Sequence, residues 1–186
     1  MNILLDDLPT DYNGYLINYS FRSGILVAES LSDDSIQDEK ARVLLALRCL
    51  FGRGIPPLEI AMEGLRWFLS GGNDKRYASN TAENLFSFIV DQELIYSAFM
   101  VKYQIDLNRE PLHYFKFLTL FSDLGGTTFQ RVVGIRSTKP KDLKNYSKEY
   151  KNEMMRLKKE FSLNPTNKFN SDEQKAIEHF ESLLKG

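Results

Sequence analysis

A glutamate and a histidine stand three positions apart in the stretch YQIDLNREPLHYFKF, as Glu110 and His113. On an α-helix this spacing places a carboxylate and an imidazole on one face, an arrangement that di-iron helical bundles use twice. The chain has two histidines. Ala176 stands three positions before the second one, His179. The second Glu-x-x-His pair is therefore absent, and the sequence predicts no metal site.

A structural role explains the same two residues better. Pro111 suits the first turn of a helix, so the sequence predicts a helix from Glu110 to about Leu124 with Asn108 as its cap. A carboxylate in the first turn is stabilised by the unpaired amides and the macrodipole. His113 then lies within one turn of that helix end.

Other catalytic patterns are also missing. The single cysteine, Cys49, lies in the apolar run VLLALRCLF, where a thiol packs and does not react. No serine stands in G-x-S-x-G, and the glycine pairs that begin at Gly71 and Gly125 lack the lysine of a phosphate-binding loop. The sequence predicts no catalytic residue and no cofactor.

Three polar residues are predicted to make contacts between helices. Asp106 is placed to accept a hydrogen bond from His113 or from Arg136. Structural contacts of this kind are commoner than general acid–base roles for such a carboxylate. We therefore assign Asp106, His113 and Arg136 as structural polar contacts.

The charge of the chain is nearly balanced but unevenly distributed. The chain has 24 lysines and arginines and 25 aspartates and glutamates, which gives a net charge of -1. This balance argues against a general nucleic-acid-binding protein. Residues 1–40 carry eight acidic and two basic side chains, whereas residues 139–160 carry eight basic and four acidic ones. The two regions could attract each other, or each could face a partner. We see neither a signal peptide nor a membrane span, and expect a cytosolic protein.

The elements that position these residues are mostly helices. An Asn-Gly pair at Asn13 predicts a short hairpin or turn near the N-terminus. The predicted helix over residues 38–51 is apolar almost all round and is expected to lie in the centre. Periodicity and capping signals predict helices over residues 21–31, 38–51, 58–69, 91–104, 110–124, 127–136, 143–163 and 171–184.

The predicted fold class is mainly α, with about seven helices, a short N-terminal hairpin or turn and a charged C-terminal helical extension. We assign residues 1–140 to a helical core domain and residues 141–186 to the extension. A linker is predicted near residues 164–170, where a proline interrupts polar residues.

The helix over residues 143–163 is highly charged and has a narrow apolar stripe. The stripe residues follow one another at spacings of four, four, three and four, as Tyr146, Tyr150, Met154, Leu157 and Phe161. Such a stripe is typical of a seam between two helices. It can dock on the body of the protein or bind a partner helix. Nucleic-acid binding is disfavoured because Glu149, Glu153 and Glu160 interrupt the positive charge.

The chain resembles the bacteriophage gene-product-fifteen tail protein family in three stretches. These stretches are DQELIYSAFMVKYQIDL, LHYFKFLTLFSDL and FQRVVGIR. The resemblance spans residues 17–163, with tyrosine and phenylalanine at positions 114 and 115 where the family tends to carry tryptophan. The pattern falls on Asp91, Ile95, Tyr96, Ala98, Phe99, Tyr103, Ile105, Asp106, Leu107, Leu112, His113, Tyr114, Phe115 and Arg136.

The resemblance implies a non-enzymatic tail-assembly protein in the cytoplasm of a bacterial host. Its implied partner is the tape-measure protein or another tail protein, with a chaperone-like role, and no nucleic acid or membrane. A structural component retained in the virion is the alternative, and a homo-oligomer is possible. The expected contact surface is the apolar stripe, with electrostatic steering from Lys148, Lys151 and Lys158.

Overall fold

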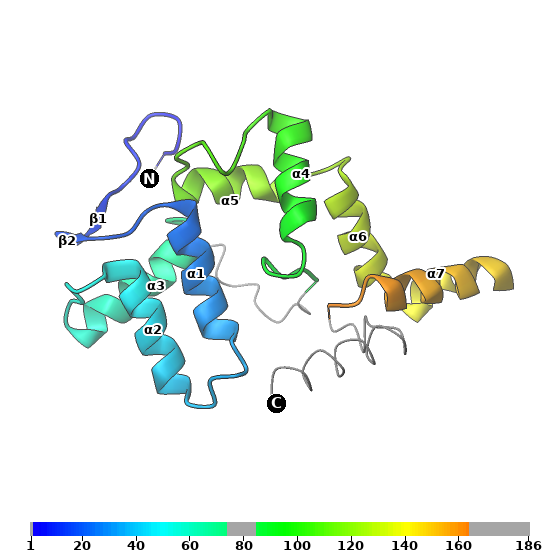
Figure 1. The fold of residues 1–186 in the computed structure, drawn as a ribbon, viewed down its shortest axis with the longest axis horizontal. Helices are drawn as coiled ribbons and strands as arrows, with labels where there is room; N and C mark the ends of the chain where they lie inside the picture. Colours follow the sequence, from blue (N-terminus) through cyan, green and yellow to red (C-terminus); the bar gives the residue numbers. More distant parts are fainter. Residues whose placement is uncertain (1, 74–84, 164–186) are drawn as a thin grey trace, which may run out of the picture. The chain divides into compact units, whose positions relative to one another are not determined.

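The computed structural model describes residues 2–73 and 85–163. Its described part contains seven α-helices, one short 3-10 helix and one two-stranded hairpin, which confirms the mainly helical fold (Figure 1). The chain divides into two compact units, residues 1–131 and residues 132–186. This division falls before the boundary predicted after residue 140. The predicted linker at residues 164–170 and the predicted helix at 171–184 lie outside the described residues.

The predicted N-terminal hairpin is confirmed. Strand β1, Asp11–Tyr12, pairs antiparallel with β2, Tyr15–Leu16. The two residues between them, Asn13 and Gly14, have φ of 51° and 82°. Two-residue hairpin turns of the primed type need positive φ at both positions, which is why Asn-Gly predicts them. Asp11 Oδ1 accepts a hydrogen bond from the Gly14 amide at 3.0 Å and closes the turn.

The first two helices begin at side-chain caps. Helix α1, Phe21–Ser32, follows Ser20, whose Oγ accepts from the Ser23 amide at 3.1 Å. Helix α2, Glu39–Phe51, follows Asp38, whose Oδ1 accepts from the Lys40 amide at 2.9 Å. Such caps satisfy amides that have no partner within the helix. Both helices lie within one residue of the predicted bounds.

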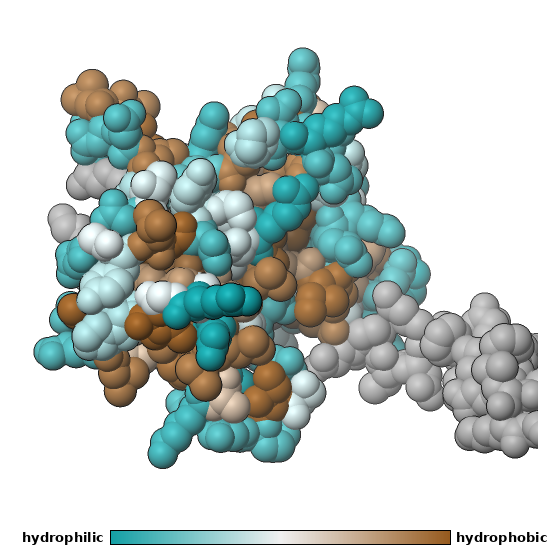
Figure 2. Space-filling view, turned by 60° about the vertical axis from the view of Figure 1, so that its left-hand side comes forward, coloured by the Kyte–Doolittle hydropathy of each residue, from teal (hydrophilic) through white to brown (hydrophobic). Residues whose placement is uncertain are grey.

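The expectation that α2 lies in the centre is wrong. Its buried residues are Ala46, Leu47, Leu50 and Phe51, while Leu44 and Leu45 are exposed. Helix α2 packs against α1 and against α3, Leu58–Leu69, and these neighbours cover one side of it. Figure 2 shows hydrophobic side chains at several places on the visible surface of the protein. A helix can therefore be apolar on most sides and still leave part of that surface open.

Helix α3 ends where the glycine pair predicts. Gly71 and Gly72 have φ of 69° and 74°, and their amides donate to the carbonyls of Phe68 and Trp67 at 2.9 Å each. This pattern satisfies the last carbonyls of the helix and needs a left-handed backbone. Helix α4, Gln92–Tyr103, likewise ends at a residue with positive φ, Gln104.

Helix α5, Tyr114–Ser122, begins four residues later than the predicted start at Glu110. Residues 112–114 instead pair with residues 19–21. The Phe21 amide donates to the Leu112 carbonyl at 2.9 Å, and the Tyr114 amide donates to the Tyr19 carbonyl at 2.8 Å. This long-range pairing satisfies backbone groups that the prediction had assigned to a first helical turn.

Aromatic rings of α5 form the centre of the first unit. The Phe117 ring stacks on Phe21 and on Phe99, with ring centroids 5.2 Å apart in both pairs. One turn earlier in the helix, Tyr114 stacks on Phe68 at 4.7 Å. A Cβ at Gly24 would overlap the Tyr114 ring, so the close crossing of α1 and α5 requires glycine there.

Three further elements follow along the chain. Helix α6, Thr128–Ser137, begins after Thr127, whose Oγ1 accepts from the Gln130 amide at 3.3 Å as predicted. The short 3-10 helix η2 covers Pro140–Leu143, and α7 covers Lys148–Glu160. Within the described ranges, no helix combines the length and the apolar content that a membrane span requires.

Candidate partner-binding surface

Helix α7 presents its apolar stripe without burying it. Ser147 caps the helix, its Oγ accepting from the Tyr150 amide at 3.2 Å, and none of the residues of α7 is buried. Apolar residues four, three and four apart lie on one side of a helix. Tyr150, Met154, Leu157 and Phe161 therefore share one side of α7, whereas Tyr146 precedes the helix and joins them through its ring contact with Tyr150.

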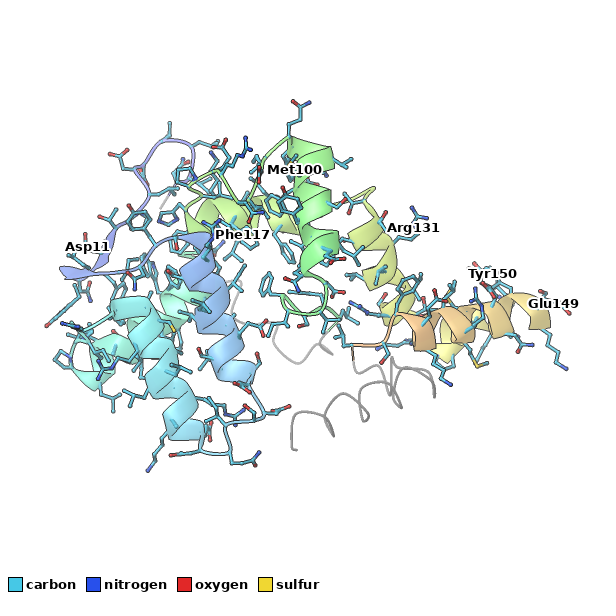
Figure 3. The ribbon with its side chains drawn as sticks, in the orientation of Figure 1. Asp11, Met100, Phe117, Arg131, Glu149 and Tyr150 are labelled. Atoms are coloured by element: carbon cyan, nitrogen blue, oxygen red, sulfur yellow. The ribbon has the colours of Figure 1, made fainter. Side chains whose placement is uncertain are left out.

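The two ends of the stripe differ in exposure. Tyr146 and Tyr150 stack at a centroid distance of 4.6 Å and are 52% and 44% exposed. Met154, Leu157 and Phe161 are half-buried. Figure 3 shows Tyr150 near the beginning of α7. We call Tyr146 and Tyr150 the tyrosine pair; it forms a flat apolar surface that solvent reaches.

Two cations fix the other end of the stripe. Lys158 Nζ donates to the Thr138 carbonyl at 2.6 Å, just after the end of α6. Arg136 Nε donates to the Phe161 carbonyl at 2.6 Å, just after the end of α7. Cations are favourable near the carbonyl ends of helices. Arg136 thus contacts the residue that follows α7, whereas its predicted partner was Asp106, and Lys158 links α7 to the end of α6.

The predicted steering lysines do not form one group. Lys151 Nζ donates to the Lys144 carbonyl at 3.1 Å, whereas Lys148 is exposed. Lys148 precedes Tyr150 by two residues, so a turn of 3.6 residues places it on the opposite side of α7. Lys151 and Lys158 lie along one edge of the stripe, seven residues apart. Their role in steering stays a prediction.

The face of α7 beside the other edge is a self-paired charged network. Arg156 donates to Glu153 in a two-pronged contact at 2.9 and 2.6 Å and to Glu160 at 3.1 Å. The hydrogen bond to Glu153 raises the pKa of Arg156, and the same bond lowers the pKa of Glu153. These charges are exposed and paired with one another, with one negative charge in excess, which is typical of a solvated face.

Asp106 anchors the loop after α4. Its Oδ1 accepts from the Tyr96 hydroxyl at 3.1 Å and from the Asn108 amide at 2.9 Å, and Arg109 Nε lies 3.4 Å from Oδ2. The bond to Asp106 raises the pKa of the Tyr96 hydroxyl. Asp106 therefore contacts Tyr96 and its own loop, and the predicted bond to His113 is not formed.

His113 is a helix cap, and both of its ring nitrogens are bonded. Nδ1 accepts from the Phe115 amide at 3.0 Å, and Nε2 lies 2.9 Å from the Pro9 carbonyl. Because an amide and a carbonyl are the two partners, the ring is neutral with its proton on Nε2. Burial lowers the pKa of His113, and the Pro9 carbonyl partly opposes that shift. His113 therefore ties the N-terminal segment to the start of α5.

The Glu-x-x-His pair does not share a helix face. Glu110 is exposed and precedes α5, and both nitrogens of His113 are bonded to the backbone. Over residues 2–73 and 85–163, no three His, Cys, Asp or Glu side chains come together in a way that could hold a metal ion.

The first unit contains a cleft of about 350 Å³ that no sequence pattern predicts. Its lining comes from α1, the turn before α4, α4 itself, the loop after α4 and α5, so no local pattern marks it. Arg22, at its edge, donates Nη2 to the Leu107 carbonyl at 2.7 Å. The lining is mostly apolar, from Phe21, Ile25, Phe88, Ile95, Leu107 and Phe117, with Arg22, Gln92, Glu93, Tyr96 and Asn108 adding polar groups.

Comparison with known proteins identifies the family. A family model described as Bacteriophage Gp15 protein matches residues 4–163. No curated protein and no solved structure matches the chain. Since the family model covers most of the sequence, the chain belongs to the bacteriophage Gp15 family, which confirms the resemblance.

Proposed function

We propose that this member of the Gp15 family is a non-enzymatic tail-assembly chaperone that binds the tape-measure protein in the host cytoplasm. Membership of the family indicates a phage structural or assembly protein. The chaperone role and the partner are our proposal. A long amphipathic helical protein exposes apolar stripes until the tail tube encloses it, and a helical partner can cover such stripes in the meantime.

The observation that carries the proposal is the exposed end of the stripe. The tyrosine pair, at the start of α7, is accessible to another helix, while the rest of the stripe is half-buried. Covering roughly 100 Å² of each ring would contribute on the order of 2 kcal/mol per tyrosine. Tyrosine is also enriched among the residues that dominate binding energies at interfaces.

We propose no reaction because the side chains that could react are bonded or packed within the fold. The two nitrogens of His113 bind Phe115 and Pro9, and the carboxylate of Asp106 holds a loop. Cys49 is half-buried, with its sulfur 3.9 Å from the Ser30 hydroxyl. A general base needs a nitrogen or an oxygen that can reach a substrate. These three groups instead support the fold.

Co-purification with the tape-measure protein tests the proposed surface. Tyr146→Asp with Tyr150→Asp places two charges on the exposed end of the stripe, where the fold does not need the rings. We expect at least about a tenfold loss of bound tape-measure protein, because a charge in a covered apolar contact must be desolvated.

The matched control is Asn152→Asp with Met155→Asp. Both residues are exposed and lie on the side of α7 away from Tyr150. This variant adds the same two negative charges to the same helix and should bind normally. Equal binding by both variants, or equal loss, would show that the tyrosine pair is not the contact surface.

Mass spectrometry of purified virions separates the chaperone from the alternative. A chaperone leaves before the particle is complete and should be missing from it. Stoichiometric copies in the virion would instead identify a structural component of the tail.

A further inference from the structure

The N-terminal segment forms a closed turn that exposes two leucines. The Leu5 and Asp6 amides donate to the Asn2 carbonyl at 3.1 and 2.9 Å, and the Asn2 amide donates to Asp6 Oδ2 at 2.6 Å. Leu4 and Leu5 are 88% and 83% exposed, the highest values among the exposed large hydrophobic residues of the described chain. We call residues 2–7 the leucine turn. Because these three hydrogen bonds close the turn without a partner, binding through it costs less conformational entropy than binding through an open chain.

The leucine turn lies in an acidic region. Residues 1–21 contain three aspartates and no lysine or arginine. Two of these aspartates, Asp6 and Asp7, directly follow the exposed leucines. A partner surface for this turn should therefore combine apolar area with positive charge.

The region around the tyrosine pair has that combination. Residues 139–151 contain five lysines and two acidic residues. Both acidic side chains serve the backbone of their own segments. Asp142 Oδ2 accepts from the Lys139 amide at 2.9 Å, and backbone hydrogen bonding in the first turn of α7 lowers the pKa of Glu149. The lysines therefore dominate the charge that this region offers to a partner.

We infer that the leucine turn of one copy binds the tyrosine pair of a second copy, so that the chain associates head to tail. Leu4 and Leu5 would cover the rings of the tyrosine pair, and Asp6 and Asp7 would face Lys144 and Lys151. The bond from Lys151 to the Lys144 carbonyl holds the Lys151 ammonium next to the backbone of Lys144. Two different surfaces meet in this contact, so it builds chains or closed rings of copies.

This association does not depend on the tape-measure protein. If the function proposed above is correct, the second copy and the tape-measure helix compete for the same tyrosine pair. Self-association would then protect the stripe until the tape-measure protein displaces it. The competition rests on the proposed function, whereas the association is tested without any phage protein besides this one.

Sedimentation velocity of the full chain, over a range of protein concentrations, tests the inference. We expect species larger than the monomer whose amount grows with concentration. Salt should weaken them, because the screening length falls from about 10 Å at 0.1 M to about 3 Å at 1 M. Losing two exposed charge pairs, by salt or by substitution, should raise the dissociation constant of self-association about tenfold.

Two charge-reversal variants make the test specific. The first is Asp6→Lys with Asp7→Lys, and the second is Lys144→Glu with Lys151→Glu. Each alone should associate at least about tenfold more weakly than wild type, because both of its surfaces then carry the same sign. An equimolar mixture should associate again, because each surface of one variant complements a surface of the other. Circular dichroism of each variant checks that the helices are retained.

Three results would overturn the inference. The first is a wild-type chain that is monomeric at every concentration, and the second is a single variant that associates as strongly as wild type. The third is a mixture that stays monomeric although both variants are folded. A variant in which Leu4 and Leu5 are changed to serine should also lose association while its charge is unchanged.

Discussion

Replacing His113 tests the structural role that its geometry assigns to it. His113→Ala removes the cap of α5, the bond to the Pro9 carbonyl and the stacking of the ring on Tyr19, whose centroid lies 5.3 Å away. A lost cap costs about 1 kcal/mol, a lost hydrogen bond about 1 kcal/mol and a lost ring pair up to about 1 kcal/mol. We expect the free energy of unfolding to fall by roughly 2 to 3 kcal/mol.

The matched variant is His113→Asn. The asparagine side chain can accept from the Phe115 amide, as the histidine does, but it is too short to bond to Pro9 as well. It should recover about 1 kcal/mol of the loss in the alanine variant. Urea unfolding at about pH 8, where histidine is neutral, measures all three proteins. A loss below about 0.5 kcal/mol in His113→Ala, or no recovery in His113→Asn, would refute the capping role.

The difference in stability between wild type and His113→Asn should depend on pH. Burial holds the pKa of His113 in the folded state below its ordinary value of 6.5. The unfolded chain therefore binds a proton more strongly, and acid favours unfolding. The advantage of wild type over His113→Asn should be complete above about pH 7, fall as the pH drops through 6.5, and level off below the folded pKa. An advantage that is constant from pH 8 to about pH 5 would contradict the neutral, doubly bonded ring.

Two further predictions concern packing and helix ends. Gly24→Ala should lower the free energy of unfolding by about 1 to 3 kcal/mol in thermal or urea unfolding, because the added methyl overlaps Tyr114. The control is Gly134→Ala inside α6, where nothing lies within 4 Å of the added atom, and it should stabilise the folded state by up to about 1 kcal/mol. Equal effects at both sites would contradict the close crossing of α1 and α5. Lys158→Met should speed amide hydrogen exchange in the last turn of α7, because its bond to Thr138 is lost. Lys159→Met, at the exposed neighbouring position, is the control, and equal acceleration in both would show that the bond does not hold the helix.

Local signals predicted the elements that depend on local physics. Asn13 and Gly14 predict a turn that needs positive φ at two successive residues, and the structure has it there. Thr127 predicts the start of α6, and Gly71 with Gly72 predicts the end of α3, because capping and left-handed backbone involve only neighbouring residues. These features follow from the sequence alone.

The predictions that failed depend on contacts between distant segments. Asn108 and Pro111 favour a helix start that the pairing of residues 19–21 with residues 112–114 overrides. The exposure of Leu44 and Leu45 depends on which side of α2 its neighbours cover, and one helix cannot specify that. The cleft could not be predicted for the same reason, because its lining comes from segments that are distant in the sequence. A pattern predicts which residues share a face, but the fold decides what that face meets.

The polar groups at the candidate sites are bonded within the protein, which is why we propose a binding surface and not a reaction centre. A side chain that serves chemistry must keep a lone pair or a proton for the substrate. His113 gives both nitrogens to the backbone, and Arg136 and Lys158 bind carbonyls at helix ends. In the described part of the chain, large apolar side chains at the leucine turn and the tyrosine pair are open to solvent instead. A partner can cover such exposed apolar area, and flanking charge can steer it; both proposals use the apolar area, and the self-association also uses charges of opposite sign.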